Sequence, residues 1–419
     1  MINIMSRNKI NLIGIVTITL SCFLLIFFAT KNSNYYDEYT KKENINSFRH
    51  NKLRNNYYYS SESQQQQQVT QNLSVTIEDV LNFQRQQLAD EMQYYEYPNG
   101  RFGVDAKNLR DLTPETGGAP MRSVIISTWR SGSTFLGDVL NALPGNYYHY
   151  EPLLTYDIVQ IRGPPNDSKA IKSLKKLLRC DYTNMQEYLE FGQSHNYLFS
   201  HNTRLWNQCH LFPNFCYQPK FLEPFCKLFP LQSMKVVRLR LKIAARLLED
   251  TSLNVRILLL IRDPRGFLQS RKHRVWCPGN ADCDNPNTVC KDLVSDYKAA
   301  EKLSKKYPMT FKAVRYEDLS LSPYDMTQEI LQFYGLAFDD RVAEFLDTHT
   351  KQNVGGVSST FRDSKSAPFH WTKELPYNEI QYIQESCKQA MKLWGYKEAS
   401  NASELLKNFN PLLPFPEFN

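Results

Sequence analysis

One stretch constrains the fold of this chain more than any other: a buried-looking strand that runs directly into a polar turn and an amphipathic helix. Residues 123–127 (SVIIS) predict the strand, residues 128–133 the turn, and residues 134–143 a helix that Pro144-Gly145 ends. Such a unit presents the unpaired N–H groups of a helix N-terminus just beyond a buried strand. Those N–H groups and the helix dipole attract anions. We therefore expect an anion-binding turn here.

The side chains of this turn suit a phosphate or a sulfate. Gly132 lets the backbone approach an anion closely, while Ser131, Ser133 and Thr134 add hydroxyl donors and Arg130 adds a charged fork. The Lys of a nucleotide-triphosphatase loop is missing, which disfavours a magnesium-bound triphosphate as the ligand. The alternative is an ordinary strand-turn-helix, in which Ser and Gly are common caps.

A second strand followed by a helix supports the anion-binding interpretation. Residues 255–261 (VRILLLI) are typical of a central parallel strand that is covered on both faces. Arg262 follows the strand, Pro264 suits the first position of a helix running through Arg274, and Ser270 lies inside that helix. Ligands of open parallel sheets bind outside the carboxyl ends of the strands. Two such turns on one sheet could hold two phosphates of one nucleotide.

Strands and helices alternate from Gly117-Gly118 to about Lys397, without an internal repeat. We expect further strands at 147–150, 235–241 and 311–316, and further helices at 244–249, 327–334, 340–348 and 378–394. This alternation predicts an α/β domain with a mainly parallel, P-loop-like sheet flanked by helices.

The N-terminal part begins with a candidate membrane anchor. Residues 12–29 are apolar and uncharged, and they are just long enough to span a bilayer. Cleavage after Ala29 would place Phe27 at the −3 position, which fits a signal peptidase site poorly. We therefore expect a cytoplasmic tail at 1–11 and an uncleaved transmembrane signal anchor at 12–29. Basic residues flank both ends, so charge alone does not decide the orientation.

The segment after the anchor has the composition of a flexible stem. Residues 30–117 are rich in Asn, Tyr, Ser and Gln, and few aliphatic residues are available to build a core, although a short helix around 77–92 is expected. We place the catalytic domain at 118–400 and a C-terminal tail at 401–419.

Cysteines and glycosylation sequons favour a lumenal domain. Eight cysteines follow the apolar span, and an even number in an exported domain predicts disulfides. They are Cys180, Cys209, Cys216, Cys226, Cys277, Cys283, Cys290 and Cys387. Zinc is the rival explanation, but its usual close Cys-x₂₋₄-Cys pair is missing. Sequons at Asn72, Asn166 and Asn401 are acceptors only if that side is lumenal, so we expect a type II membrane protein. The cysteine pairing and the sequon occupancy stay open.

The net charge of +7 is modest for 419 residues, and acidic residues are interleaved with the basic ones. A dedicated nucleic-acid binder usually clusters its positive charge, so we expect no nucleic-acid partner. The balance is compatible with a cleft for anionic ligands.

The two turns together resemble a known family. TWRSGST at 128–134 and IRDPRGFLQSR at 261–271 are similar to the 5′-phosphosulfate and 3′-phosphate binding motifs of Golgi carbohydrate sulfotransferases. The likeness is closest to the branch that sulfates galactose, N-acetylglucosamine or N-acetylgalactosamine at carbon 6. Further similar stretches extend the resemblance over residues 122–397. They are HYEPLL, VRYEDL, FRDSKSAPFHW and MKLWGYK. The resemblance implies the sulfotransferase fold, the Golgi membrane, and 3′-phosphoadenosine 5′-phosphosulfate (PAPS) as sulfate donor, with no metal required.

The resemblance also implies roles for the residues of both motifs. Arg130 would stabilise charge on the bridging oxygen and the 5′-phosphate, and Arg262 and Ser270 would hold the 3′-phosphate. Arg362 and Lys365 would contact the donor from the loop at 354–366. The residues that would cradle the phosphosulfate are Ser131, Gly132, Ser133 and Thr134.

Glu151 is the expected general base. It ends the strand predicted at 147–150, beside the first turn, and related sulfotransferases use a Glu at about this offset to take the proton of the acceptor hydroxyl. The alternative is a structural carboxylate paired with Arg130 or another Arg. His149 is a second candidate for this role.

Some of the remaining candidates have a simple structural explanation, and for others two explanations stay open. Glu317 and Asp318 fit the acidic start of a helix. Trp371 either stacks on a ligand or anchors the last helices in the core. The basic residues of the strand expected at 235–241 either meet an anionic glycan or face solvent, and we assign them no role. These residues are Lys235, Arg238 and Arg240.

The expected acceptor is a glycan or glycosaminoglycan, such as a chondroitin, keratan or N-acetylglucosamine-containing chain. The competing hypotheses are a nucleotide kinase or triphosphatase with a degenerate loop, a protein-tyrosine sulfotransferase, and a non-catalytic lumenal binding protein that keeps the fold. The acceptor sugar and the oligomeric state, a homodimer included, stay open.

Overall fold

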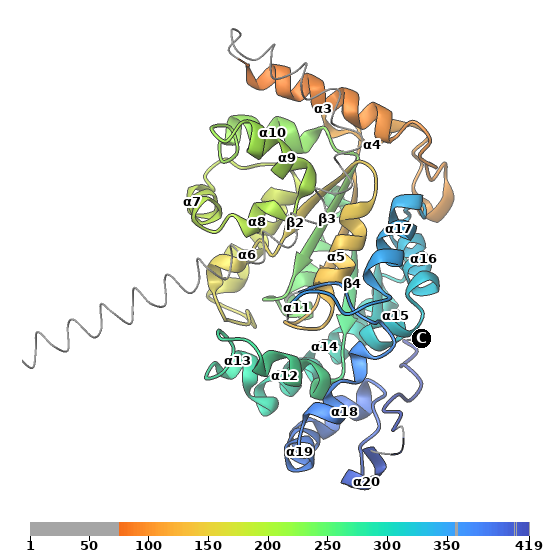
Figure 1. The fold of residues 1–419 in the computed structure, drawn as a ribbon. Helices are drawn as coiled ribbons and strands as arrows, with labels where there is room; N and C mark the ends of the chain where they lie inside the picture. The colour runs from red at the N-terminus through yellow and green to blue at the C-terminus, as the bar shows by residue number, and fades with distance from the viewer. Residues whose placement is uncertain (1–74, 357–358, 406, 408, 419) are drawn as a thin grey trace, which may run out of the picture. The chain divides into compact units, whose positions relative to one another are not determined.

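The computed structural model describes residues 75–419 apart from 357–358, 406, 408 and 419 (Figure 1). The described residues belong to one compact unit that begins at Val75. None of the helices in this part of the chain has both the length and the apolarity of a membrane span. The predicted tail at 1–11, the anchor at 12–29 and the sequon at Asn72 lie outside the described residues.

Five parallel strands form a single sheet in the order β2-β3-β1-β4-β5. The central strand β1 pairs with β3 on one side and with β4 on the other. The strands are β1 (Met121–Ile126), β2 (Asn146–Tyr150), β3 (Leu231–Val236), β4 (Val255–Ile261) and β5 (Phe311–Arg315). The predicted parallel sheet is thus confirmed, and the two turns predicted to bind anions follow the adjacent strands β1 and β4.

The strand expected at 235–241 is wrong in its position. β3 spans Leu231–Val236, and all six of its residues are buried, including polar Gln232 and Lys235. Polar residues in a buried strand hide it from a pattern based on hydrophobicity. Beyond Val236 the chain leaves the ladder, and Arg240 is the N-cap of the short helix α11 (Leu241–Ala244). The helix expected at 244–249 forms only as a 3₁₀ turn at Ala245–Leu247.

Helices cover both faces of the sheet (Figure 1). Alternate residues of β4 enter two separate apolar clusters: Ile257, Leu259 and Ile261 lie in one, and Leu258 and Leu260 lie in the other. A parallel strand that is buried on both faces reads as a continuous apolar run, which explains why β4 was predicted at its observed bounds.

Besides α11, the helices after β1 are α5 (Ser133–Ala142), α6 (Asn166–Leu178), α7 (Gln186–Ser194), α8 (Tyr197–Ser200), α9 (Thr203–Leu211), α10 (Pro219–Lys227), α12 (Pro264–Lys272), α13 (Ala281–Asp284), α14 (Pro286–Lys306), α15 (Tyr316–Leu321), α16 (Pro323–Tyr334), α17 (Asp340–His349), α18 (Trp371–Glu374), α19 (Tyr377–Leu393) and α20 (Ala402–Leu405). One face of the sheet packs against α5, α15, α16 and α17, and the other against most of the remaining helices. The predictions for 134–143, 264–274, 327–334, 340–348 and 378–394 are confirmed within a few residues as α5, α12, α16, α17 and α19.

The segment 75–117, expected to be stem, belongs to the compact unit. The helix α3 (Ile77–Glu91), which the sequence predicts, buries Val80, Leu81 and Leu88 in the main core, and α4 (Leu109–Leu112) follows it. The compact unit therefore begins about 40 residues before the domain boundary expected at 118. The apolar residues of α3 are few, but their spacing places them on one face, which is enough to dock a helix.

Residues 412–415 of the segment expected to be a C-terminal tail pack on the domain. Leu412 forms an antiparallel bridge with Tyr396, and Arg315 donates a 2.8 Å hydrogen bond to the carbonyl oxygen of Leu413. The ring of Phe415 stacks on buried Trp394. These contacts hold the segment beside the end of β5.

All eight cysteines that follow the apolar span form disulfides, as their even number predicts. Cys290–Cys387 links α14 to α19 across 97 positions, so it closes the longest loop and removes the most chain entropy from the unfolded state. The other pairs are Cys180–Cys226, Cys209–Cys216 and Cys277–Cys283. Every one of these sulfurs is thus bonded to another sulfur, which rules out the zinc alternative for them.

We predict that Leu88→Ala lowers the free energy of unfolding by about 2–5 kcal/mol, because it opens a cavity in the core beneath α3. Phe83→Ala on the same helix is the control, since that side chain is 43% exposed and its loss should cost less than about 1 kcal/mol. Denaturant unfolding of a protein beginning at Val75 measures both values. Equal losses would mean that α3 is not part of the core.

Candidate functional site

The carboxyl ends of the five parallel strands meet at one edge of the sheet, and each is followed by a polar or aromatic residue of the candidate site. Arg130 follows β1, Glu151 follows β2, Arg238 follows β3, Arg262 follows β4 and Tyr316 follows β5. Ligands of such sheets bind at this edge. The structure thus brings together residues that are far apart in the sequence.

The turn after β1 is shaped by two residues with left-handed backbone. Arg130 has φ 65° and Gly132 has φ 82°, and Gly132 is the N-cap of α5 without a side chain to cap it. A Cβ atom on Gly132 would lie 2.3 Å from the ring of Tyr316, so only glycine fits. A left-handed Arg is strained by about 1–3 kcal/mol, and such strain concentrates at functional sites.

A buried hydroxyl in the same turn lacks a partner. Ser131 is fully buried, and its Oγ has no hydrogen-bond partner among the described residues. A buried hydroxyl without a hydrogen-bond partner destabilises the fold unless a ligand accepts a hydrogen bond from it. Together with the uncapped start of α5, this group fits an anionic ligand in the turn.

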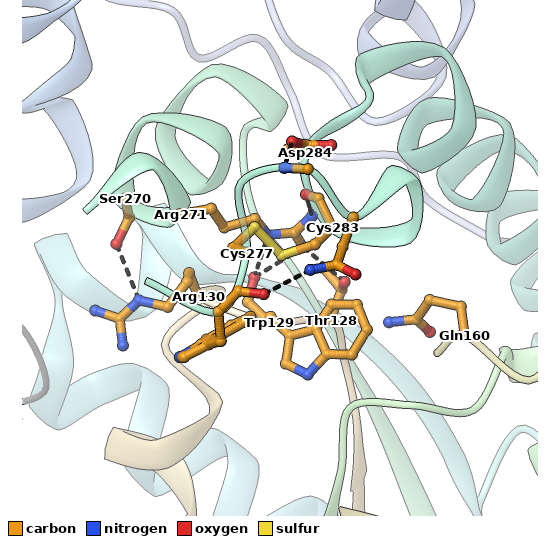
Figure 2. The surroundings of a disulfide bond; sticks show 12 residues. Thr128, Trp129, Arg130, Gln160, Ser270, Arg271, Cys277, Cys283 and Asp284 are labelled. Atoms are coloured by element: carbon orange, nitrogen blue, oxygen red, sulfur yellow. Dashed lines mark hydrogen bonds between the residues drawn. A yellow bond between two sulfur atoms is a disulfide. The ribbon is translucent and has the colours of Figure 1, made fainter. Parts of the chain in front are cut away.

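Arg130, Arg262 and Ser270 come together as predicted. Arg130 donates from Nε to Ser270 Oγ at 3.0 Å (Figure 2), and Arg262 donates from Nη1 to the Arg130 carbonyl oxygen at 2.8 Å. The guanidinium of Arg262 lies 4.5 Å from the centre of the Tyr316 ring, and its Nε is buried without a partner in the described part of the chain. The two turns therefore share one site.

The electrostatics of the site also fit an anion. Burial, followed by the positive charges of Arg274, Arg262 and Arg362, lowers the pKa of Arg130 to about 9. Crowding several guanidinium groups in a buried place is unfavourable, and a bound phosphate or sulfate relieves that repulsion. The sequence pattern did not single out Arg274.

The loop at 354–366 contributes one of its two predicted residues to the cluster. Arg362 is close enough to lower the pKa of Arg130, and it donates hydrogen bonds to the carbonyl oxygens of Gly356 and Phe361. The side chain of Lys365 is exposed, and no contact between it and the arginines is present among the described residues. Lys365 as a donor contact therefore stays a prediction.

Glu151 lies between two buried cations. Its carboxylate pairs with Lys235 Nζ at 2.7 Å and with Arg238 Nη1, and the side chains of the two cations are 1% and 5% exposed. Burial alone would raise the pKa of Glu151, but Lys235 and Arg238 outweigh it and lower the pKa to about 2. Glu151 also has left-handed backbone, with φ 40°.

Lys235 links Glu151 to the anion-binding turn. Its Nζ donates to Thr134 Oγ1 at 3.0 Å as well as to Glu151, and it lies 3.9 Å from the centre of the Tyr150 ring. One ammonium group thus joins the two halves of the site. The sequence assigns no role to Lys235 or Arg238. The signal that could have identified this pair is a basic residue, Lys235, within the fully buried strand β3.

The remaining candidates have structural contacts. His149 is buried beside Tyr147, and burial lowers its pKa to about 3. Arg240 pairs with buried Asp296, and Glu317 accepts hydrogen bonds from the Asp263 N–H and the Tyr396 hydroxyl. Trp371 is fully buried against Arg265, so it anchors the last helices. In the part of the chain that the structure describes, no three potential metal ligands gather.

Comparison with known proteins decides the family. The family model for the sulfotransferase domain matches residues 120–395, which is more than half of the 419 residues. The chain belongs to the sulfotransferase family. The resemblance seen in the two turns is thereby confirmed, and this sulfotransferase is a transferase whose family implies PAPS as the sulfuryl donor.

Curated relatives of this sulfotransferase carry carbohydrate names. It is 28% identical to mouse (Mus musculus) carbohydrate sulfotransferase 1 over 68% of the chain and 81% of that protein. It is 26% identical to mouse carbohydrate sulfotransferase 4, over 68% of the chain and 84% of the relative. It is 26% identical to carbohydrate sulfotransferase 3 of Tetronarce californica, over 69% of the chain and 76% of that protein.

We predict that Gly132→Ala weakens binding of 3′-phosphoadenosine 5′-phosphate, the donor without its sulfuryl group, by about tenfold or more. The added methyl group combines left-handed strain with the collision against Tyr316. Gly100→Ala is the matched control, because Gly100 has φ 85° but open space around it, so the variant should bind normally. Isothermal titration calorimetry measures both; normal binding by Gly132→Ala would place the donor elsewhere.

Proposed function

We propose that this sulfotransferase transfers the sulfuryl group of PAPS to the 6-hydroxyl of galactose, N-acetylglucosamine or N-acetylgalactosamine in a glycan or proteoglycan chain, with Glu151 as general base. The observation that carries the proposal is the link from Glu151 through Lys235 to Thr134 in the donor turn. The carbohydrate names of the relatives support a sugar acceptor.

The donor would lie along the edge formed by β1 and β4. The N-terminus of α5, Arg130 and the turn hydroxyls would hold the 5′-phosphosulfate, while Arg262 and Ser270 would hold the 3′-phosphate. Arg362 would add positive charge from the loop, and Lys365 would join it when the loop contacts the donor. The turn residues in this role are Ser131, Gly132, Ser133 and Thr134.

The transfer is a substitution at sulfur. The sugar oxygen forms a bond to sulfur while the bond from sulfur to the 5′-phosphate oxygen breaks, and the leaving oxygen keeps the electron pair. Glu151 takes the proton of the sugar hydroxyl and later releases it to solvent. Arg130 and the N-terminus of α5 stabilise the negative charge on the leaving phosphate. The products are the sulfated sugar and 3′-phosphoadenosine 5′-phosphate.

Lys235 would couple donor binding to the strength of the base. With a pKa of about 2, Glu151 is deprotonated but a weak base. Lys235 already contacts Thr134, so an anionic donor in the turn would compete for its ammonium group. Withdrawing positive charge from Glu151 raises its pKa and makes it a stronger base when the donor is present.

The cellular setting follows from the N-terminal segment and the disulfides. Residues 12–29 would anchor the protein in the Golgi membrane, with the catalytic domain in the lumen. Four disulfides are consistent with an oxidising compartment. The acceptor would be a chondroitin, keratan or N-acetylglucosamine-containing chain.

We predict that Glu151→Gln lowers kcat for sulfate transfer by about 10²–10⁴-fold, as expected for loss of a general base, while nucleotide binding survives. Radiolabelled PAPS and a panel of desulfated chondroitin, desulfated keratan and N-acetylglucosamine-terminated glycans measure the transfer. Glu91→Gln is the matched control, because Glu91 pairs with Arg204 at 2.8 Å near the start of β2, away from the carboxyl ends of the strands, and this variant should keep its kcat.

The outcomes of this assay separate the hypotheses. Label at carbon 6 of one sugar, lost in Glu151→Gln alone, would support the whole proposal. Transfer to tyrosine peptides and to no glycan would favour a protein-tyrosine sulfotransferase. Nucleotide binding without transfer to any acceptor would favour a non-catalytic binding protein.

The depressed pKa of Glu151 also predicts how stability depends on pH. A carboxylate with a folded-state pKa of about 2, against an ordinary value of 4.5, stabilises the fold above pH 4.5, and that stabilisation is lost as the pH falls toward 2. We expect the difference in unfolding free energy between wild type and Glu151→Gln to shrink by on the order of 3 kcal/mol across this window. Urea unfolding at several pH values measures it; a constant difference would contradict the ion-paired state.

A further inference from the structure

Arg271 is a buried cation whose hydrogen bonds all go to neutral oxygens. It donates from Nε and Nη2 to the carbonyl oxygen of Trp129 at 3.0 and 2.9 Å, and from Nη2 to Thr128 Oγ1 at 2.7 Å. Its Nη1 donates to the Cys283 carbonyl oxygen at 2.6 Å (Figure 2). No carboxylate among the described residues lies within ion-pair distance of this guanidinium. Its hydrogen bonds instead connect two backbone segments.

One of these segments is the start of the donor turn. Thr128 and Trp129 immediately precede Arg130, whose backbone is left-handed. A residue in that conformation keeps its geometry only where its surroundings hold it. The two hydrogen bonds from Arg271 to the Trp129 carbonyl oxygen act one residue before the strained position, so Arg271 can fix the direction in which the turn leaves β1.

The other segment is a small loop closed by the disulfide Cys277–Cys283. Both cysteines are fully buried and pack with Trp129 and Val237 in an apolar cluster separate from the main cores. The ring of Trp276 contacts that of Trp129 edge-on, with the ring centroids 6.1 Å apart. The loop therefore lies directly against the residue that precedes Arg130.

The loop has further polar contacts that do not involve the residues of the donor turn. Asp282 accepts a 2.7 Å hydrogen bond from the Gln160 N–H and pairs with Arg162 at 2.8 Å. Gln160 in turn donates to the Val237 carbonyl oxygen at 2.8 Å. The loop can hold the donor turn in place only if other contacts fix the loop itself. The hydrogen bonds of Asp282 and Gln160, the ion pair with Arg162 and the disulfide do so.

We propose that Arg271 is a positioning residue for the donor and that the Cys277–Cys283 disulfide keeps the carbonyl oxygen of Cys283 where Arg271 needs it. This inference rests on the proposed function, in which the turn at 128–134 binds the phosphosulfate. Opening the disulfide frees the loop, loosens Arg271 and lets the turn leave its donor-binding geometry. The hydrogen bonds of Glu151 go to Lys235 and Arg238 rather than to this loop, so we expect opening the loop to act on donor binding.

The test compares two disulfides of nearly equal loop size. Cys277→Ser with Cys283→Ser opens the loop of sequence separation 6, and Cys209→Ser with Cys216→Ser opens one of separation 7 at the end of α9. We expect the first variant to bind 3′-phosphoadenosine 5′-phosphate about tenfold more weakly and to show a raised KM for PAPS with little change in kcat. The second variant should match the wild type in both.

A second variant covers the case in which opening the loop unfolds the protein. Arg271→Lys keeps the charge and both disulfides but removes the planar fork, and it should show the same raised KM for PAPS. Unchanged nucleotide binding by the disulfide variant, or an unchanged KM in Arg271→Lys, would overturn the inference. Failure of the wild type to bind the nucleotide would instead contradict the proposed function.

Discussion

The parallel alignment of the five strands is the constraint on which the rest of this sulfotransferase depends. Parallel strands must be joined by long crossovers, and these crossovers supply the helices on both faces of the sheet (Figure 1). The same alignment brings every strand to its end at one edge. Residues as distant as Arg130 and Arg262 therefore lie within hydrogen-bond distance, and they do so without long loops.

The edge is divided into two electrostatic halves. At β1 and β4 the positive charges of Arg130 and Arg262 crowd together, and burial, followed by the neighbouring arginines, lowers the pKa of Arg130. At β2 and β3 the charges of Lys235 and Arg238 are offset by Glu151. The first half carries the excess positive charge that suits the proposed donor, whereas the second holds Glu151, the proposed base. Lys235 lies at their boundary.

The support beneath the edge is built from polar contacts as much as from apolar packing. Arg271 and Arg240 are both nearly inaccessible to solvent, and each donates to backbone oxygens near the carboxyl end of β1. Buried guanidinium groups are costly unless their donors are satisfied. Their presence here is consistent with a site whose backbone must be held in a strained conformation, since directional hydrogen bonds hold a backbone more specifically than apolar contacts.

The sequence by itself determined the local units. The strands at β1 and β4, the turn around Gly132 and the helix begun by Pro264 follow from runs of neighbouring residues, so their patterns were visible without the fold. Only the tertiary structure decided where β3 lies, that α3 belongs to the compact unit, how the cysteines pair and which residues contact Glu151. The reason is physical: these features depend on residues far apart in the sequence, and the charge of Lys235 hides a buried strand until Glu151 and Thr134 are brought beside it.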